Sequence, residues 1–174
     1  MLRTLARTVP RRVAAQIQAR SLSTVSPIYT TTTTATGSRA AGTIKSHDSS
    51  LELKMDMPKE LGGKGAQHNP EQLFGAAYAT CYLSAMGATH GNLNKGAKPL
   101  PKSTKVDAVV SIGKDADEKL AGFLLAVELK IHAAPLKEVG LNDEQIQKLV
   151  EEAHKMCPYS RAVEGNVAVK LTVV

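Results

Sequence analysis

Apolar and polar residues alternate with a period of two in several stretches of the chain, which predicts strands with one buried face. The first stretch, residues 42–58, is expected to form a hairpin that turns at 47–50 and ends at Pro58. Residues 103–115 and 121–134 follow the same pattern further along the chain. The segment between these two strands is too long for a tight hairpin turn.

A different pattern fills residues 70–90, which are apolar on every side of a helix. The stretch opens with Asn69 as a cap and Pro70 in the first helical position. A helix of this kind is expected to be buried on all faces. Because a sheet covers only one face of a helix, the remaining surface is expected to pack against a partner subunit. The apolar positions are Leu73, Phe74, Ala76, Ala77, Tyr78, Ala79, Tyr82, Leu83, Ala85 and Met86.

A second helix is predicted at 142–156, where Asn142 and Gln145 make a capping box. Its apolar residues form a single stripe, and an alternating strand at 164–174 follows it. The order strands, helix, strands, helix, strand predicts an α+β fold with an antiparallel or mixed sheet covering the apolar helix. The chain has no internal repeat and no linker between domains, so residues 27–174 are expected to form one domain.

The charge of the chain is concentrated at its beginning. The formal net charge is +6, but residues 1–26 hold five arginines and no acidic residue. Without those five, 17 of the 22 basic residues stand against 16 acidic ones, so the body is nearly neutral. Aromatic residues make up 3% of the chain and tryptophan is absent, which argues against a nucleic-acid surface. No apolar run is long enough for a membrane span.

Residues 1–26 have the composition of a mitochondrial transit peptide, rich in Arg, Ser, Ala and Leu and amphipathic if helical. The alternative interpretation is a disordered basic tail. The threonine-rich segment 27–40 that follows fits either a linker or an edge strand. The leader predicts a mitochondrial matrix location, a reducing compartment in which cysteines are seldom structural disulfides.

The chain has two cysteines, Cys81 in the apolar helix and Cys157 at the end of the second helix. A cysteine in an apolar helix is most often an inert buried thiol. His154 and Cys157 have the spacing of two metal ligands on one helix face, but no further paired ligand accompanies them, and no metal site is predicted. A hydrolase lacks support, because the chain has no nucleophile elbow.

The segment "NPEQLFGAAYATCYLSAM" together with "CPYSRAVEGNVAV" resembles the two cysteine motifs of the organic hydroperoxide resistance (Ohr) proteins of the Ohr/OsmC family. The loop "PKELGGKGAQHNPEQ" and the hairpin "GSRAAGTIKSHDSSLELKMDMP" are also similar to that family, so the resemblance covers residues 28–174. It implies an OsmC-like fold, an intertwined homodimer and a thiol peroxidase that reduces organic hydroperoxides to alcohols. No bound cofactor is implied. The reductant implied is an external lipoyl dithiol, dihydrolipoamide or a lipoylated protein.

The resemblance also implies the site residues. Cys81 takes the place of the peroxidatic cysteine and Cys157 that of the resolving cysteine. Arg39 falls where the family keeps an arginine in its active site, and Glu71 where it keeps the glutamate that holds this arginine. The segment "GSRAAG" is a loose version of the family's pattern, and Arg161 is a rival basic group near Cys157.

The chemistry of a peroxidase requires a thiolate, whereas an apolar helix raises the pKa of a thiol. A guanidinium beside Cys81, held by Glu71, would favour the thiolate. Ten residues of helix span about 15 Å, so Glu71 and Cys81 cannot share a site on one straight helix. Either the helix begins after Glu71, or Glu71 serves the Cys81 of the other subunit. We expect the second arrangement, an active site at the dimer interface.

In this setting, Leu73, Phe74, Tyr78, Tyr82 and Met86 either line a slot for alkyl or lipid hydroperoxides or simply pack in the core. Two other functions fit the same residues. One is an OsmC-type peroxidase with a different substrate range. The other is a non-catalytic dimeric module that binds a hydrophobic ligand and leaves Cys81 inert.

Overall fold

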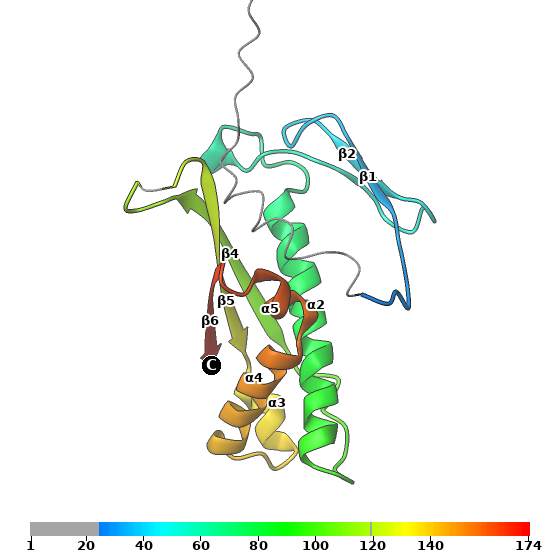
Figure 1. Ribbon diagram of the computed structural model, residues 1–174, viewed down its shortest axis with the longest axis vertical. Coiled ribbons are helices and arrows are strands. Elements are labelled where there is room, and N and C mark those ends of the chain that lie inside the picture. Colours follow the sequence, from blue (N-terminus) through cyan, green and yellow to red (C-terminus); the bar gives the residue numbers. More distant parts are fainter. Residues whose placement is uncertain (1–24, 119) are drawn as a thin grey trace, which may run out of the picture.

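The computed structural model describes residues 25–118 and 120–174 of the chain. The predicted transit peptide therefore lies almost entirely outside the described residues, since only Val25 and Ser26 of it are included. Two three-stranded sheets flank a long helix, α2, which is drawn in green in Figure 1.

The strands and helices follow one another in an α+β order. They are β1 (Thr33–Thr36), β2 (Thr43–Ser46), β3 (Glu52–Lys54), the single-turn η2 (Lys59–Leu61), α2 (Pro70–Leu93), β4 (Val106–Lys114), β5 (Phe123–Ile131), α3 (Ala133–Glu138), α4 (Asp143–Met156), α5 (Pro158–Val163) and β6 (Ala168–Val173). This confirms the predicted fold class.

The larger sheet has the order β4-β5-β6. The strands β4 and β5 are antiparallel, and β6 joins β5 in parallel, so the sheet is mixed. One face of this sheet is covered by α2, and α4 packs against α2 in turn. The alternating residues of β5 place Val127, Leu129 and Ile131 on the covered face, where they are buried.

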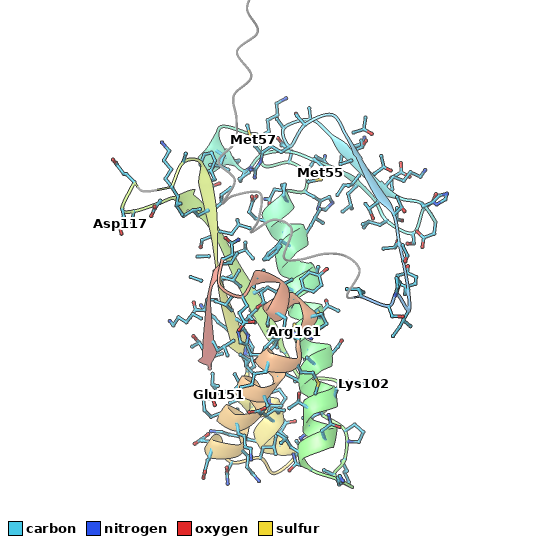
Figure 2. The ribbon with its side chains drawn as sticks, in the orientation of Figure 1. Met55, Met57, Lys102, Asp117, Glu151 and Arg161 are labelled. Atoms are coloured by element: carbon cyan, nitrogen blue, oxygen red, sulfur yellow. The ribbon has the colours of Figure 1, made fainter. Side chains whose placement is uncertain are left out.

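The smaller sheet has the order β1-β2-β3, all antiparallel, and lies where α2 begins, extending away from the larger sheet (Figure 1). Every residue of β1 is exposed, so the threonine-rich segment contributes an edge strand. The predicted second strand of the hairpin is shorter than expected, because β3 ends at Lys54. Met55 and Met57 lie instead in the segment that leads towards α2 (Figure 2), where Met55 bridges His68.

The caps that the sequence indicates set the starts of both long helices. The side chain of Asn69 accepts a hydrogen bond from the Gln72 backbone N–H. The side chain of Gln72 accepts one from the Asn69 backbone N–H, which completes a capping box. Asn142 and Gln145 do the same for α4. Each box satisfies backbone N–H groups that the first turn of a helix leaves unpaired.

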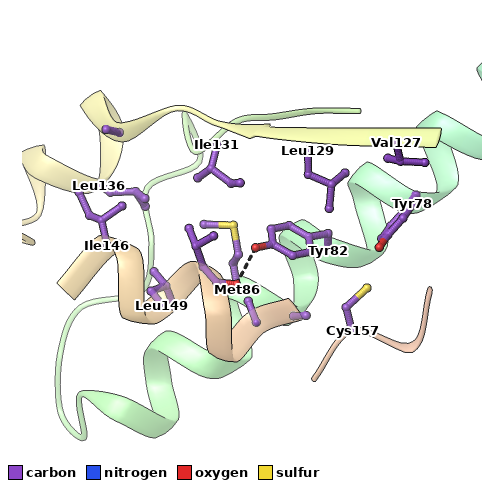
Figure 3. Packing of buried hydrophobic residues seen from close by; sticks show 14 of the residues in the cluster. Tyr78, Tyr82, Met86, Val127, Leu129, Ile131, Leu136, Ile146, Leu149 and Cys157 are labelled. Carbon is purple, nitrogen blue, oxygen red and sulfur yellow. Dashed lines mark hydrogen bonds between the residues drawn. The ribbon is translucent and has the colours of Figure 1, made fainter. Parts of the chain in front are cut away.

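The core lies between α2, α4 and the larger sheet (Figure 3). Tyr78, Tyr82 and Met86 of α2 are fully buried there and meet Leu129 and Ile131 of β5. The hydroxyl of Tyr82 donates to the Val150 carbonyl at 2.7 Å, which ties α2 to α4. This core holds α4 against α2.

Within the single chain α2 is not buried on all faces, and its cover by a partner subunit stays a prediction. One stripe of the helix is exposed and consists of small uncharged residues, Ala76, Thr80, Ser84, Gly87 and Ala88. The sheet and α4 cover the other faces, because only two layers of one chain reach the helix. Among the described residues, no helix is both long enough and apolar enough to cross a membrane.

Candidate active site

The two cysteines, far apart in the sequence, meet at the middle of α2. The sulfur atoms of Cys81 and Cys157 are 3.6 Å apart, and both thiols are free. Cys81 lies on α2 and is half-buried, whereas Cys157 is fully buried at the junction of α4 and α5. A disulfide needs the sulfurs about 2.05 Å apart, so a small movement joins them.

The surroundings of Cys81 oppose its ionisation. Burial raises the pKa of the Cys81 thiol, and the neighbouring Cys157 side chain raises it further. A hydrogen bond from the Tyr159 backbone acts in the opposite direction and lowers that pKa. Among the described residues of the same chain, no cationic side chain is a cause of the shift. The described part of one chain therefore gives Cys81 no positive charge that would stabilise its thiolate.

The arginine and the glutamate that the sequence indicates also meet, but with each other. Nη2 of Arg39 lies 2.8 Å from both carboxylate oxygens of Glu71. The Glu71 side chain is 13% exposed and that of Arg39 is 35% exposed. Nε of Arg39 is buried without a hydrogen-bond partner among the described residues, so the guanidinium has donor capacity to spare.

The structure therefore brings the four predicted site residues together as two pairs. The helix α2 begins at Pro70 and includes Glu71, so the idea that the helix begins after Glu71 is wrong. With a rise of about 1.5 Å per residue, Cys81 is about 15 Å along the helix axis from the Arg39–Glu71 pair. The rival, Arg161, lies on α5 (Figure 2), is exposed, and is not a cause of the Cys81 pKa shift.

An open groove of about 600 Å³ runs between the first half of α2 and strand β4. Glu71 and the small residues Gly75, Ala76 and Ala79 of α2 line it on one side. A methyl group added at Gly75 would lie 3.2 Å from Val110, so glycine here permits the close approach of helix and strand. Strand β4 lines it with Asp107 and with four apolar residues, Val106, Ala108, Val110 and Ile112.

Tyr78 lies near both cysteines, and its ring contacts two other aromatic rings. The rings of Phe74 and Tyr78 meet edge to face at 5.9 Å, and the ring of Tyr78 lies 6.0 Å from that of Tyr159. Burial raises the pKa of Tyr78, which therefore stays neutral. Of the residues considered for a substrate slot, Tyr78, Tyr82 and Met86 are fully buried core residues, whereas Leu73 and Phe74 are half-buried.

Two features of the site were missed by the sequence analysis, namely the short helix α5 and the hydrogen bond from the Tyr78 hydroxyl to the Ser160 hydroxyl. The late proline after Cys157 is the only signal for a new helix start there. In the described part of the chain, no group of three or more His, Cys, Asp or Glu side chains is placed to hold a metal ion.

Comparisons with known proteins agree with this geometry. Residues 63–172 match the family model described as OsmC-like protein. The chain is 41% identical over 147 residues to the organic hydroperoxide resistance protein of Xanthomonas axonopodis pv. citri, covering 84% of this chain and 94% of the relative. It is 37% identical over 149 residues to the organic hydroperoxide resistance protein OhrA of Bacillus subtilis, covering 84% of this chain and 96% of the relative.

Solved structures give the same result. The crystal structure of an organic hydroperoxide resistance protein from Legionella pneumophila superposes with a TM-score of 0.73 at 38% identity, covering 85% of this chain and 98% of that one. The structure of OhrB of Bacillus subtilis superposes with a TM-score of 0.70 at 35% identity, covering 85% of this chain and 100% of that one. Organic hydroperoxide resistance proteins are cysteine-based peroxidases, and the paired thiols mark this chain as an oxidoreductase of that kind. The chain belongs to the Ohr/OsmC family.

Proposed function

We propose that this protein is a thiol-dependent peroxidase that reduces organic hydroperoxides to alcohols, with Cys81 as the peroxidatic and Cys157 as the resolving cysteine. The observation that carries the proposal is the 3.6 Å separation of the two free sulfurs across elements distant in the sequence. An inert core cysteine has no need of a second thiol at this distance.

In the proposed cycle, the Cys81 thiolate attacks the outer oxygen of the hydroperoxide, the O–O bond breaks, and the alkoxide leaves as an alcohol after taking up a proton. Cys81 becomes a sulfenic acid. The Cys157 sulfur then attacks the Cys81 sulfur, the S–O bond breaks, and water leaves. The resulting Cys81–Cys157 disulfide is reopened by thiol exchange with an external dithiol, which is oxidised to a cyclic disulfide.

The positive charge required by this chemistry comes from a second subunit in our proposal. The Arg39–Glu71 pair is about 15 Å along α2 from Cys81 of the same chain, and the exposed stripe of small residues on α2 begins between Glu71 and Cys81 and continues past Cys81. Packing two such stripes together in a homodimer covers the stripe of both helices. Arg39 and Glu71 of one protomer then serve Cys81 of its partner.

The proposed substrate class is alkyl and lipid hydroperoxides, because the half-buried Cys81 packs against the apolar core. The proposed reductant is a lipoyl dithiol, dihydrolipoamide or a lipoylated protein. The proposed location is the mitochondrial matrix, on the basis of the acid-free, arginine-rich segment 1–26. A matrix location would place the protein beside the lipoylated dehydrogenase complexes.

The test is consumption of tert-butyl and fatty-acid hydroperoxides by the protein without residues 1–26. Dihydrolipoamide with its dehydrogenase is compared with thioredoxin as the electron source, and Cys81→Ser serves as the inactive control. We expect turnover with the lipoyl system that is lost in the variant. Absence of turnover with either reductant, together with no sulfenic acid trapped at Cys81, would instead favour a module that binds a hydrophobic ligand.

A further inference from the structure

The mechanism above leaves one buried polar contact without a role. The hydroxyl of Tyr78 donates to the hydroxyl of Ser160 at 2.9 Å. Tyr78 is fully buried and Ser160 is 3% exposed, so the bond is made away from solvent. It joins α2 to α5 one turn before Cys81 on one side and one turn after Cys157 on the other. Tyr78 and Ser160 are therefore each one helical turn from one cysteine of the pair.

Cys157 is held differently on its two sides. On the preceding side α4 is long, and its apolar stripe is buried against α2. The helix ends before Cys157, whose φ of −66° and ψ of 121° are extended. On the following side α5 has only six residues. A helix this short is not stable by itself, so tertiary contacts must hold it in place.

One side chain of α2 supplies two of those contacts. The Tyr78 hydroxyl bonds Ser160, and the Tyr78 ring lies 6.0 Å from the ring of Tyr159. The backbone of Tyr159 in turn makes the hydrogen bond to the Cys81 sulfur. Figure 3 shows Tyr78 and Cys157 at the same end of the buried cluster, whereas Tyr82 reaches towards α4.

We propose that Tyr78 is a positioning residue, whose hydrogen bond to Ser160 fixes α5 and holds Cys157 ready to condense with the Cys81 sulfenic acid. The inference rests on the proposed peroxidase function. Two reactions compete for the sulfenic acid. In one, the Cys157 sulfur attacks the Cys81 sulfur and displaces hydroxide, which takes up a proton and leaves as water. In the other, a second hydroperoxide transfers oxygen to Cys81, giving a sulfinic acid and a second alcohol.

Fixing α5 favours the first reaction, because the sulfurs must close from 3.6 Å to about 2.05 Å along one direction. If α5 is released, Cys157 samples other positions, and a larger share of the sulfenic acid is oxidised by a second hydroperoxide. Tyr78 contacts neither the hydroperoxide nor the developing alkoxide in this scheme. Its removal is therefore expected to change how the sulfenic acid is consumed, not how fast it forms.

The test uses the variants Tyr78→Phe and Ser160→Ala, their combination, and Tyr82→Phe as a matched control. Tyr82→Phe also removes one buried hydroxyl from α2, but that hydroxyl bonds α4 through Val150. The readouts are the Cys81 sulfinic acid formed per turnover, by intact mass, and the rate of the first oxidation of Cys81, by stopped flow. Thermal melting of each variant reports folding.

Both single variants are expected to form about ten times more sulfinic acid per turnover than the wild type, the factor that corresponds to one ordinary hydrogen bond. The double variant should be no worse than either single one, since both remove the same interaction. In Tyr82→Phe the sulfenic acid should divide between disulfide and sulfinic acid as in the wild type. The rate of the first oxidation of Cys81 should be unchanged in all variants. If Tyr78→Phe fails to fold, Ser160→Ala alone decides, because it removes only one buried oxygen.

Wild-type partitioning in Tyr78→Phe or in a folded Ser160→Ala would overturn the positioning role while leaving the peroxidase function intact. An equal rise in Tyr82→Phe would also overturn it, because the effect would then follow from general loosening of the core. A wild-type protein that consumes no hydroperoxide at all would refute the proposed function itself, a result that the first oxidation of Cys81 detects separately.

Discussion

Arg39, between β1 and β2, forms an ion pair with Glu71 in the first turn of α2, where one guanidinium nitrogen lies 2.8 Å from both carboxylate oxygens. Cys81 lies on the same helix, about 15 Å further along its axis. The ion pair and the thiol therefore occupy different places in one protomer. Because of this separation, we look to the second subunit for the positive charge that acts on Cys81.

Complementation between inactive variants tests whether Arg39 acts across the subunit interface. Arg39→Ala and Cys81→Ser are co-expressed with different tags, and the heterodimer is purified through both. If Arg39 acts on the partner's Cys81, the heterodimer holds one complete site and should show about half the wild-type activity per dimer. If Arg39 acts within its own chain, both sites are broken and the heterodimer stays inactive.

The pH dependence of the Cys81 reaction is expected to shift when Arg39 is removed. Burial raises the pKa of the Cys81 thiol, and a nearby guanidinium would lower it again. In Arg39→Ala the thiolate should therefore form only at higher pH than in the wild type. At neutral pH this lowers the rate by about tenfold or more.

The measurement is the rate of alkylation of Cys81 by iodoacetamide between pH 5 and 10, in a Cys157→Ser background that leaves one thiol. Arg39→Lys keeps the charge without the fork and should fall between the wild type and Arg39→Ala. An unchanged profile in Arg39→Ala would mean that another cation, or none, activates the thiol.

Cys157→Ser is expected to keep the first oxidation of Cys81 but to lose sustained turnover. Without the sulfur 3.6 Å away, the sulfenic acid has no intramolecular partner. Excess hydroperoxide should therefore convert Cys81 to the sulfinic acid, visible as two added oxygens in the intact mass. Sustained turnover with dihydrolipoamide in this variant would show that the external dithiol attacks the sulfenic acid directly.

The exposed stripe on α2 is expected to be the centre of the homodimer. Ser84→Arg places a long charged side chain among small residues, where a helix of the second protomer would pack. Light scattering should show a monomer, and hydroperoxide turnover should fall with it. Lys148→Glu, on the exposed face of α4, is the matched control and should stay dimeric and active. A dimeric, active Ser84→Arg would contradict this interface.

Local features of the sequence predicted the frame of the molecule well. The capping boxes at Asn69 and Asn142 set the starts of α2 and α4, and the alternating stretches became β4, β5 and β6. These features depend on neighbours in the sequence. The placement of β6 parallel to β5 could be narrowed only to an antiparallel or mixed sheet, because strand order depends on distant contacts.

The site was less accessible to sequence reasoning. Cys81 and Cys157 could be paired only through the family resemblance, because nothing local relates them. The Tyr78–Ser160 bond joins residues 82 positions apart, and no periodic pattern indicates it. Tyr82 and Met86 illustrate a second limit, since an all-apolar helix does not show which positions face the core.

The leader provides the last prediction. Residues 1–26 carry five arginines and no acidic residue, the charge that mitochondrial import favours. Fused to a fluorescent protein, this segment should direct it to the matrix, and the fusion should be shortened by cleavage after import. Replacing Arg3, Arg7, Arg11 and Arg12 with glutamate reverses the charge and should leave the fusion in the cytosol, uncleaved. A wild-type fusion that stays cytosolic would favour a basic tail instead. The lipoyl reductant would then lose its argument from location and depend on the comparison with thioredoxin alone.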